Sequence, residues 1–284
     1  MIFCAPLMPV EATRLVRKMR GGAQAHLLEC GDGHFYVVKF RNNPQHRRIL
    51  INEWIASVFL NYLQISAPAA AIVNLSGEFL ESNPEIHIQL GTRHLGVEPG
   101  WHFGSRYPGD PAKVMVYDFL PDPLLDKVVN VNEFLGVLAF DKWMGNADAR
   151  QSIFFRARLR QWSPSAAEQA PRAGFVAHMM DHGYVFDGPH WIFPDSPLQG
   201  LYFRPSVYQN VRSLDDFEPW LDRVVHFPEE VVDAAQKQIP PDWLAEDAAE
   251  LEAMLAKLMS RRKRVPDLIR ESRRGRVNPF PAWK

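Results

Sequence analysis

The chain has 284 residues, of which 46% are hydrophobic and 23% are charged, as in an ordinary globular protein with a sizeable core. Its formal net charge of -1 gives no overall preference for nucleic acid or for a membrane surface. Two cysteines without metal-ligand spacing argue against a disulfide framework, and no apolar run is long enough to span a bilayer, so we expect a cytoplasmic protein.

The first part of the chain alternates apolar runs with turn signals. Residues 25–40 read AHLLECGDGHFYVVKF, in which Asp32-Gly33 separates two strand-like runs and predicts a β-hairpin. Residues 48–63 carry apolar side chains at three- and four-residue steps, which predicts an amphipathic helix. Further strands are expected over 68–75, 86–90 and 114–120, with a long loop over 90–113.

A strong breaker, Pro121-Asp122-Pro123, separates this part from a more helical one. Beyond it we expect helices over 131–143 and 244–258, strands over 152–155 and 175–180, a polar turn over 146–150 and a loop over 163–172. Strands therefore dominate the first ~120 residues and helices the rest, which is an α+β order rather than a series of βα units.

Phosphoryl transfer needs a donor-rich cover over the phosphates, a cation, carboxylates that hold Mg²⁺, and a group that orients the acceptor. Lys39 lies in an apolar run, where a lysine is costly to bury unless it is paired. Glu53, among the apolar residues of the following helix, is a candidate partner. Either side chain could instead lie on an exposed face, so this buried pair is a hypothesis.

Two aspartates follow apolar elements. Asp148 lies in a polar turn that joins a helix directly to a strand, and such loops commonly carry functional sites. Asp181 ends an apolar strand before His182-Gly183 and resembles the metal-binding Asp-Phe-Gly element of kinases. Both could also be ordinary turn residues. Because His178 and His182 lack metal-site spacing, we favour Mg²⁺ over a transition metal.

Taken together, these motifs resemble the HipA-like kinase family and, more remotely, the phosphoinositide kinases. The resemblance covers residues 21–186. The segments that carry it are the glycine pair Gly21-Gly22, Val37-Val38-Lys39, Glu53, the run VMVYDFLP at 114–121, Phe140–Asp148, Ile153-Phe154-Phe155 and Met180–Gly183. The Asn-x-Asp turn together with the later Asp-x-Gly is the most specific part.

The resemblance implies a bilobal protein-kinase-like fold, with a small β-rich N-lobe at 1–120 and a larger helical C-lobe at 121–284 that form one kinase domain. It also implies ATP and Mg²⁺ as cofactors. On that basis Asp148 is the catalytic aspartate, Asp181 chelates Mg²⁺, and Lys39 with Glu53 binds the α- and β-phosphates. Two further segments would contact the nucleotide: the turn of Gly21, Gly22, Ala23 and Gln24, and the linker of Met115, Val116, Tyr117 and Asp118.

One departure from the family pattern affects the metal site. A metal-binding Asn usually stands five residues after the catalytic Asp, and here that position is Ile153, which cannot bind metal. Gln151 is the nearest amide that could replace it.

Three functions therefore remain open. The first is a kinase that transfers the γ-phosphoryl group of ATP to a hydroxyl of a protein (Ser or Thr) or of a small molecule. The second is a nucleotide-binding pseudokinase, which Ile153 favours and the joint presence of Lys39, Asp148 and Asp181 disfavours. The third is nucleotidyl transfer to protein. By analogy with toxin-type relatives, an antitoxin-type protein is a plausible partner.

The basic run over 261–276 also has two interpretations. It is either a solvated helix with a fraying terminus, which we favour, or a surface for an anionic partner.

Overall fold

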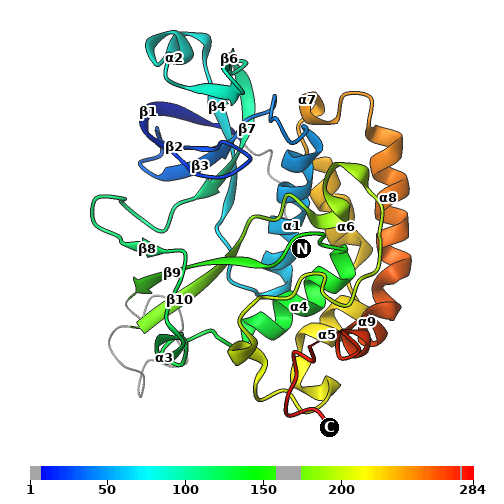
Figure 1. Cartoon of the computed structure of the whole chain (residues 1–284). Coiled ribbons are helices and arrows are strands. Elements are labelled where there is room, and N and C mark those ends of the chain that lie inside the picture. Colours follow the sequence, from blue (N-terminus) through cyan, green and yellow to red (C-terminus); the bar gives the residue numbers. More distant parts are fainter. Residues whose placement is uncertain (1–7, 158–173, 276) are drawn as a thin grey trace.

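The computed structural model describes residues 8–157, 174–275 and 277–284. Five strands form a closed barrel in the order β1-β2-β3-β7-β4 (Figure 1). They are β1 (Val10–Lys18), β2 (His26–Cys30), β3 (Phe35–Lys39), β4 (Ala70–Leu75) and β7 (Gly100–Arg106). The β1–β4 pair is parallel and the other pairs are antiparallel.

Alternating side chains of the barrel strands build its interior. Tyr36 and Val38 of β3 pack with Leu28, Val73 and Leu75 of the neighbouring strands, and all five are buried. Because successive side chains of a strand point to opposite faces, the other residues of β3, among them Lys39, lie on the outer face of the barrel.

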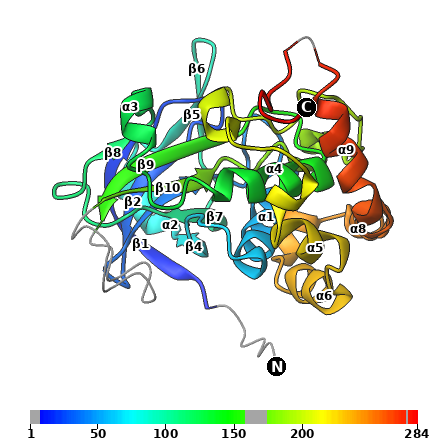
Figure 2. The ribbon, with the colours of Figure 1, turned by 90° about the horizontal axis from the view of Figure 1, so that it is seen from below.

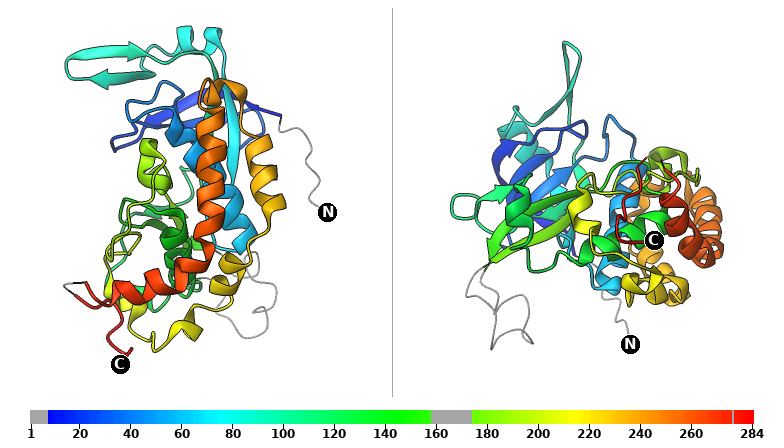
Figure 3. Two further views of the ribbon diagram at one scale, coloured as in Figure 1. Left: turned by 90° about the vertical axis from the view of Figure 1, so that its right-hand side faces the viewer. Right: turned by 60° about the horizontal axis from the view of Figure 1, so that its bottom comes forward.

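A small insertion lies between β4 and β7 in the chain, and Ile88 within it belongs to the same buried cluster as the interior of the barrel. It comprises α2 (Gly77–Ser82) and a hairpin of β5 (His87–Leu90) and β6 (Arg93–Gly96). The hairpin projects away from the rest of the molecule (Figure 3, left).

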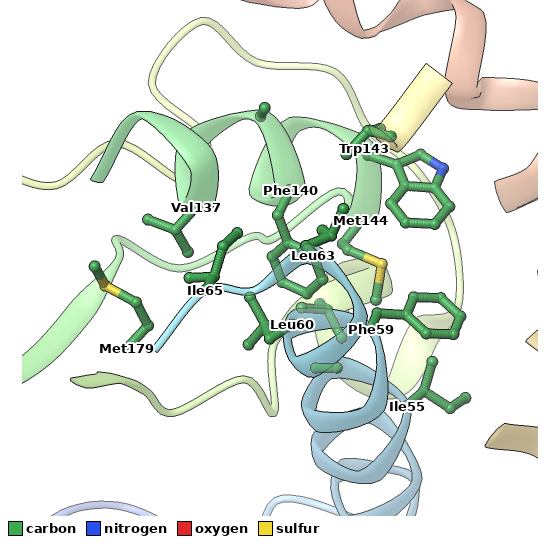
Figure 4. Close-up of a cluster of buried hydrophobic side chains, with 14 of the residues drawn as sticks. Ile55, Phe59, Leu60, Leu63, Ile65, Val137, Phe140, Trp143, Met144 and Met179 are labelled. Carbon is green, nitrogen blue, oxygen red and sulfur yellow. The ribbon is translucent and has the colours of Figure 1, made fainter. Parts of the chain in front are cut away.

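Helix α1 (Arg48–Leu63) joins the barrel to the helices that follow in the chain. Its side chains belong to the same buried cluster as those of α4 (Figure 4), and the rings of Phe59 and Trp143 are stacked 5.4 Å apart. Phe103 of the barrel strand β7 lies in this cluster too. The helix that carries Glu53 is therefore held from both sides.

Helix α4 (Glu133–Met144) and α1 are surrounded by the later helices of the chain (Figures 1 and 2). These are α5 (Trp220–Val225), α6 (Glu229–Lys237), α7 (Pro241–Leu244), α8 (Ala248–Arg261) and α9 (Val265–Ser272). The short helix α3 (Asp122–Leu125) lies apart from them (Figure 1). Short 3-10 helices cover Val185–His190, Pro205–Tyr208, Leu214–Phe217 and Arg262–Arg264. Within the described ranges, no helix combines the length and apolar character that crossing a membrane requires.

A three-stranded sheet in the order β10-β9-β8 lies beside α4 (Figure 2). Its strands are β8 (Val116–Tyr117), β9 (Gln151–Ala157) and β10 (Gly174–Met180). The turn with Asp148 enters this sheet at β9, and Asp181 leaves it after β10.

Most predicted elements are confirmed, and α1 has the predicted bounds. The loop predicted over 90–113 is wrong, because β6 and the barrel strand β7 lie within it. The strand predicted over 114–120 is reduced to Val116–Tyr117, and β1 was not predicted. The helix predicted over 244–258 begins at Ala248 instead, because α7 ends before Ala245, whose φ is 44°.

Two further predictions have a different status. The loop predicted over 163–172 lies outside the described residues. The division into lobes after residue 120 stays a prediction, and α1 packs with the C-terminal helices although it precedes that position.

The basic run at the C-terminus is not simply a solvated helix, contrary to our preferred interpretation. Arg261 is 5% exposed, pairs with Asp195, and donates to the carbonyl oxygens of Lys142 and Trp143 at 3.1 and 3.0 Å. Arg262 donates to the carbonyl oxygen of Phe227. These arginines hold the end of α4 and the neighbouring segments in place.

Candidate active site

Lys39 is the centre of the candidate site. Its ammonium Nζ donates to Glu53 Oε1 and to Asp181 Oδ1, the latter at 2.7 Å. Lys39 is 9% exposed and Glu53 only 3%, so the exposed positions that the sequence left open for them are excluded. The structure therefore contains the predicted pair and adds Asp181 to it.

The charges of Lys39 and Asp181 stabilise each other's ionised forms. Burial alone would lower the pKa of Lys39, but the carboxylates of Glu53 and Asp181 raise it above its usual value. The ammonium of Lys39 in turn holds the pKa of Asp181 below its usual range, so Asp181 stays ionised at neutral pH. Burial raises the pKa of Glu53, and the Asp181 carboxylate adds to this, whereas Lys39 lowers it; the ion pair that the surroundings favour is therefore that of Lys39 with Asp181.

The chain after Asp181 folds back onto α1. Asp181 has a φ of 58°, and this left-handed turn lets the backbone N–H of His182 donate to Glu53 Oε1 at 3.1 Å. Gly183 follows in close contact with α1, since a Cβ there would lie 2.7 Å from Cγ2 of Ile49. The glycine of this Asp-x-Gly sequence is therefore needed for close packing against α1.

Asn52 fixes the same segment and was not singled out in the sequence. Its amide Nδ2 donates to the carbonyl oxygens of Gly183, Val185 and Gly188 at 2.8, 3.1 and 2.9 Å. Its Oδ1 accepts from the indole of Trp191 at 2.9 Å. The signal available in the sequence was a second polar residue, next to Glu53, inside an otherwise apolar helix.

Asp148 lies at the surface, in the turn after α4. The helix ends at Gly145, whose φ is 61°, and Asn146 Oδ1 accepts from the backbone N–H of Asp148 at 3.2 Å. One carboxylate oxygen of Asp148 accepts from the N–H of Ala149 at 2.7 Å, and the other from Gln151 Nε2 at 3.2 Å. The structure thus brings the two predicted residues Asp148 and Gln151 together.

Arg150 links the turns of the two aspartates and was not singled out in the sequence. It forms a buried ion pair with Asp141 of α4. Its Nη1 also donates to the carbonyl oxygen of Met180 at 2.8 Å, one residue before Asp181. This side chain therefore ties the end of β10 to the turn that holds Asp148.

The glycine turn connects β1 and β2 and approaches the segment after Asp181. Gly21 has a φ of 116°, which favours glycine. A Cβ at Gly22 would lie 3.0 Å from Gln45 Nε2, which donates to the hydroxyl of Tyr184 at 3.4 Å. Gln24 accepts from the backbone N–H of Gln89 in β5 at 2.7 Å. Its side chain therefore anchors the turn to β5.

The predicted linker has a mixed placement. Val116 and Tyr117 form β8 and pair with Phe155 and Phe154 of β9, whereas Met115 is 70% exposed. A cavity of about 680 Å³ lies nearby, between the segments 33–35, 67–69 and 106–110, with His178 of β10 in its wall. Among the described residues that line this cavity, none belongs to the linker Met115–Asp118.

The donor set fits a hard divalent cation that also binds phosphate. Asp181 uses Oδ1 for Lys39, and Gln151 uses Nε2 for Asp148, so Asp181 Oδ2 and Gln151 Oε1 remain as oxygen ligands. Both ring nitrogens of His182 are engaged, by Arg150 and by the carbonyl oxygen of Met179. Over the described ranges, no three His, Cys, Asp or Glu side chains cluster as a metal site. Two such oxygens, completed by phosphate and water, would suit a hard cation such as Mg²⁺ or Mn²⁺ rather than zinc or copper.

Comparisons with known proteins bear on the fold and on the family of the chain. The fold is similar to that of two solved structures of the Golgi casein kinase, one of them with Mn/ADP bound. They share 14% and 13% sequence identity with the chain, and their TM-scores are 0.51 and 0.52. Each match covers 95% of this chain, and it covers 73% and 74% of the two casein kinase chains. No curated protein sequence matches the chain. The model of the HipA-like kinase family matches residues 12–156, just over half of the sequence, and the chain therefore belongs to that family.

Proposed function

We propose that the protein is an ATP-dependent kinase that transfers the γ-phosphoryl group to the hydroxyl of a serine or threonine, or of a small molecule. The observation that carries this proposal is the buried ammonium of Lys39 between Glu53 and Asp181. In kinase chemistry, such a lysine binds the α- and β-phosphates and a neighbouring aspartate binds the metal. The match to the HipA-like family supports the same chemistry.

The position of the large cavity favours one orientation of the bound nucleotide, with adenine in the cavity and the phosphates toward Lys39. Phe35, in the wall of the cavity, lies on the same outer face of β3 as Lys39, four residues earlier, or roughly 13 Å along a strand. His178, also in the cavity wall, lies on β10, and Asp181 directly follows the end of that strand. Adenine in the cavity would therefore place the phosphates near Lys39. The adenine contacts then come from 106–110 rather than from Met115–Asp118.

The residues around the phosphates would divide the work. Lys39 balances the charge of the α- and β-phosphates, and Glu53 keeps its ammonium in position. The turn of Gly21, Gly22 and Ala23 offers backbone N–H groups to the phosphates. Asp181 and Gln151 would hold Mg²⁺, which neutralises the charge that develops on the phosphoryl oxygens.

Asp148 would act on the acceptor. Its carboxylate lies at the surface, where a hydroxyl of a protein or small molecule has access, and Gln151 and Ala149 orient it. In this position it would accept the proton of the attacking hydroxyl. Arg150 donates both to Asp141 and to the carbonyl oxygen of Met180, and these hydrogen bonds would fix the position of that turn relative to Asp181.

The test is radiolabel transfer from γ-labelled and from α-labelled ATP with Mg²⁺, with the wild type and Asp148→Ala. We expect transfer from the γ-label alone, to the protein itself or to an added acceptor, and a loss of at least about 100-fold in the variant. Transfer from the α-label would instead support nucleotidyl transfer. Transfer that is equal in Asp148→Ala would remove Asp148 from the mechanism.

A pseudokinase is the second candidate, because of Ile153. This residue stands where the family pattern has a metal-binding Asn, and it is 8% exposed within β9, so it offers no metal ligand. A thermal shift with ATP, measured with and without Mg²⁺, tests this candidate, since a ligand that binds the native state raises its stability. Stabilisation by ATP without transfer of either label would support it.

A further inference from the structure

The first residue of helix α1, Arg48, forms an ion pair with Asp247, which lies 199 positions later in the chain. Asp247 directly precedes α8, and its carboxylate accepts from Arg48 through both oxygens, at 3.0 Å from Nε and 2.5 Å from Nη2. The Asp247 side chain is 8% exposed and that of Arg48 18%. Arg47 contacts the same carboxylate at 3.2 Å. A two-point contact of this kind fixes the orientation of the arginine as well as its distance.

Arg48 also holds the segment after Asp181. Its Nη1 donates to the carbonyl oxygen of Pro189 at 2.9 Å, and its guanidinium carbon lies 4.2 Å from the centroid of the Trp191 ring. One side chain therefore joins the start of α1, the start of α8 and the segment 183–191. The hydrogen bond of Arg48 to Asp247 lowers the pKa of this carboxyl group, which keeps it ionised at neutral pH.

A second contact comes from α7, next to Asp247 in the chain. Trp243 is fully buried, and its ring packs edge-on against Trp54 of α1 with centroids 6.4 Å apart. Its indole N–H donates to the carbonyl oxygen of Trp101 in β7 at 2.9 Å. The segment 241–247 thus holds α1 against the barrel and against α8.

These contacts lie close to the chemistry. Glu53 is five residues after Arg48, or roughly 7.5 Å along the helix axis. A hydrogen bond tolerates only a few tenths of an ångström, and misplacement by about 1 Å can cost a hundredfold in rate. A loosened start of α1 would therefore reach Glu53, and through it Lys39.

We infer that Asp247 is a positioning residue for the kinase reaction: through Arg48 it holds α1 and the segment 183–191 so that Glu53 meets Lys39 and Asp181. This inference rests on the proposed function for its effect on the rate, but its structural part stands without it. The contact between Lys39 and Glu53 is then maintained by hydrogen bonds within the chain itself.

The experiment compares Asp247→Asn with Asp242→Asn. Asp242 lies in the same segment and also pairs with an arginine, but this is Arg41 at 3.1 Å, which lies outside α1, and the Asp242 side chain is 64% exposed. For Asp247→Asn we expect kcat to fall at least about tenfold while the KM for ATP changes less than about threefold. We also expect faster hydrogen exchange of the backbone amides in 48–63 and 183–191. Asp242→Asn should behave as the wild type in both measurements.

Two controls separate positioning from a general loss of stability. Leu268→Ala removes a buried side chain of α9, away from α1, and should lower the Tm without the selective change in exchange or kcat. Asp247→Glu should restore part of the kcat, because the carboxylate remains. Equal exchange in 48–63 and 183–191 for Asp247→Asn and Asp242→Asn would overturn the inference, whether or not the wild type transfers phosphate. Faster exchange in Asp247→Asn, together with a wild type that transfers no phosphate, would contradict the proposed function alone.

Discussion

Arg150 and Asp141 form an ion pair whose two side chains have no exposed surface, and it lies between the turns of Asp148 and Asp181. The remaining donors of Arg150 go to the carbonyl oxygen of Met180 and to the ring of His182. Asp141 also accepts from Asn146 Nδ2 at 3.0 Å. The polar turn that carries Asp148 is therefore built on a buried network and not on solvent-exposed contacts.

This pair predicts a strongly non-additive response to mutation. Arg150→Met or Asp141→Leu alone leaves a buried charged partner uncompensated, and each should lower the free energy of unfolding by about 3–5 kcal/mol. The double variant Asp141→Leu with Arg150→Met should lose much less than the sum of the two. Urea unfolding of the four proteins gives the coupling free energy. Additive losses would show that the two side chains do not stabilise the fold as a pair.

Gly183 predicts a second coupling, with Ile49. A Cβ at this position would lie 2.7 Å from Cγ2 of Ile49, so Gly183→Ala must push the segment after Asp181 away from α1. We expect a fall in kcat of about tenfold or more, since His182 would lose its hydrogen bond to Glu53. Ile49→Ala in the same chain should restore part of the rate by making room. If the double variant is no faster than Gly183→Ala, contact with Ile49 is not the cause.

The helices and strands that were predicted correctly are those whose buried positions are occupied by apolar residues. Helix α1 has the predicted bounds, but its predicted amphipathic character is wrong: residues Ile49 to Ala56 are all buried, because one side packs on the barrel and another on α4. Strand β7 was missed because its buried positions include His102 and Gly104, which carry no apolar signal. Glycine is required at 104, since a Cβ there would lie 2.5 Å from Val73. Strand β1 was missed because most of its side chains are exposed.

The candidate site divides in the same way. Lys39, Glu53 and Asp181 could be grouped because each interrupts an apolar run or ends one, and a buried charge requires a partner. Asn52 and Arg150 were not recognised as parts of the site because their roles depend on carbonyl oxygens far away in the sequence. No local pattern reports which distant carbonyl a side chain meets. The cavity lined by 106–110 depends likewise on three segments that only the fold brings together.

Gln151 gives a prediction about metal dependence. If its Oε1 is a Mg²⁺ ligand, Gln151→Ala should raise the Mg²⁺ concentration for half-maximal activity by about 10–100-fold. Gln151→Glu offers an oxygen of the same reach and should keep the dependence within about threefold of the wild type. Arg156→Ala, on the same strand but away from the turn of Asp148, serves as the surface control. An unchanged Mg²⁺ dependence in Gln151→Ala would leave Asp181 as the protein ligand in question.

His102 predicts how stability depends on pH. It has no exposed surface, its Nδ1 accepts from the backbone N–H of Arg41 at 2.9 Å, and its Nε2 donates to the carbonyl oxygen of Glu98 at 3.0 Å. Burial lowers the pKa of His102 to about 3, from the ordinary value of 6.5 that applies in the unfolded chain. Between these two values the unfolded chain binds a proton that the folded one does not. The stabilising contribution of His102 is therefore complete above pH 6.5 and is lost as the pH falls toward 3.

The variant His102→Gln isolates this contribution. The constant cost of the substitution is taken from urea unfolding at about pH 7.5, where the imidazole is neutral in both states. On moving to about pH 5, the wild type should lose about 2 kcal/mol more than the variant in the free energy of unfolding, at about 1.4 kcal/mol for each pH unit below the unfolded pKa. The other buried histidines among the described residues, His26, His178 and His182, are present in both proteins and cancel in the difference. An equal loss in the two proteins would mean that His102 takes up its proton as readily in the folded chain as in the unfolded one, which its buried hydrogen bonds to Arg41 and Glu98 forbid.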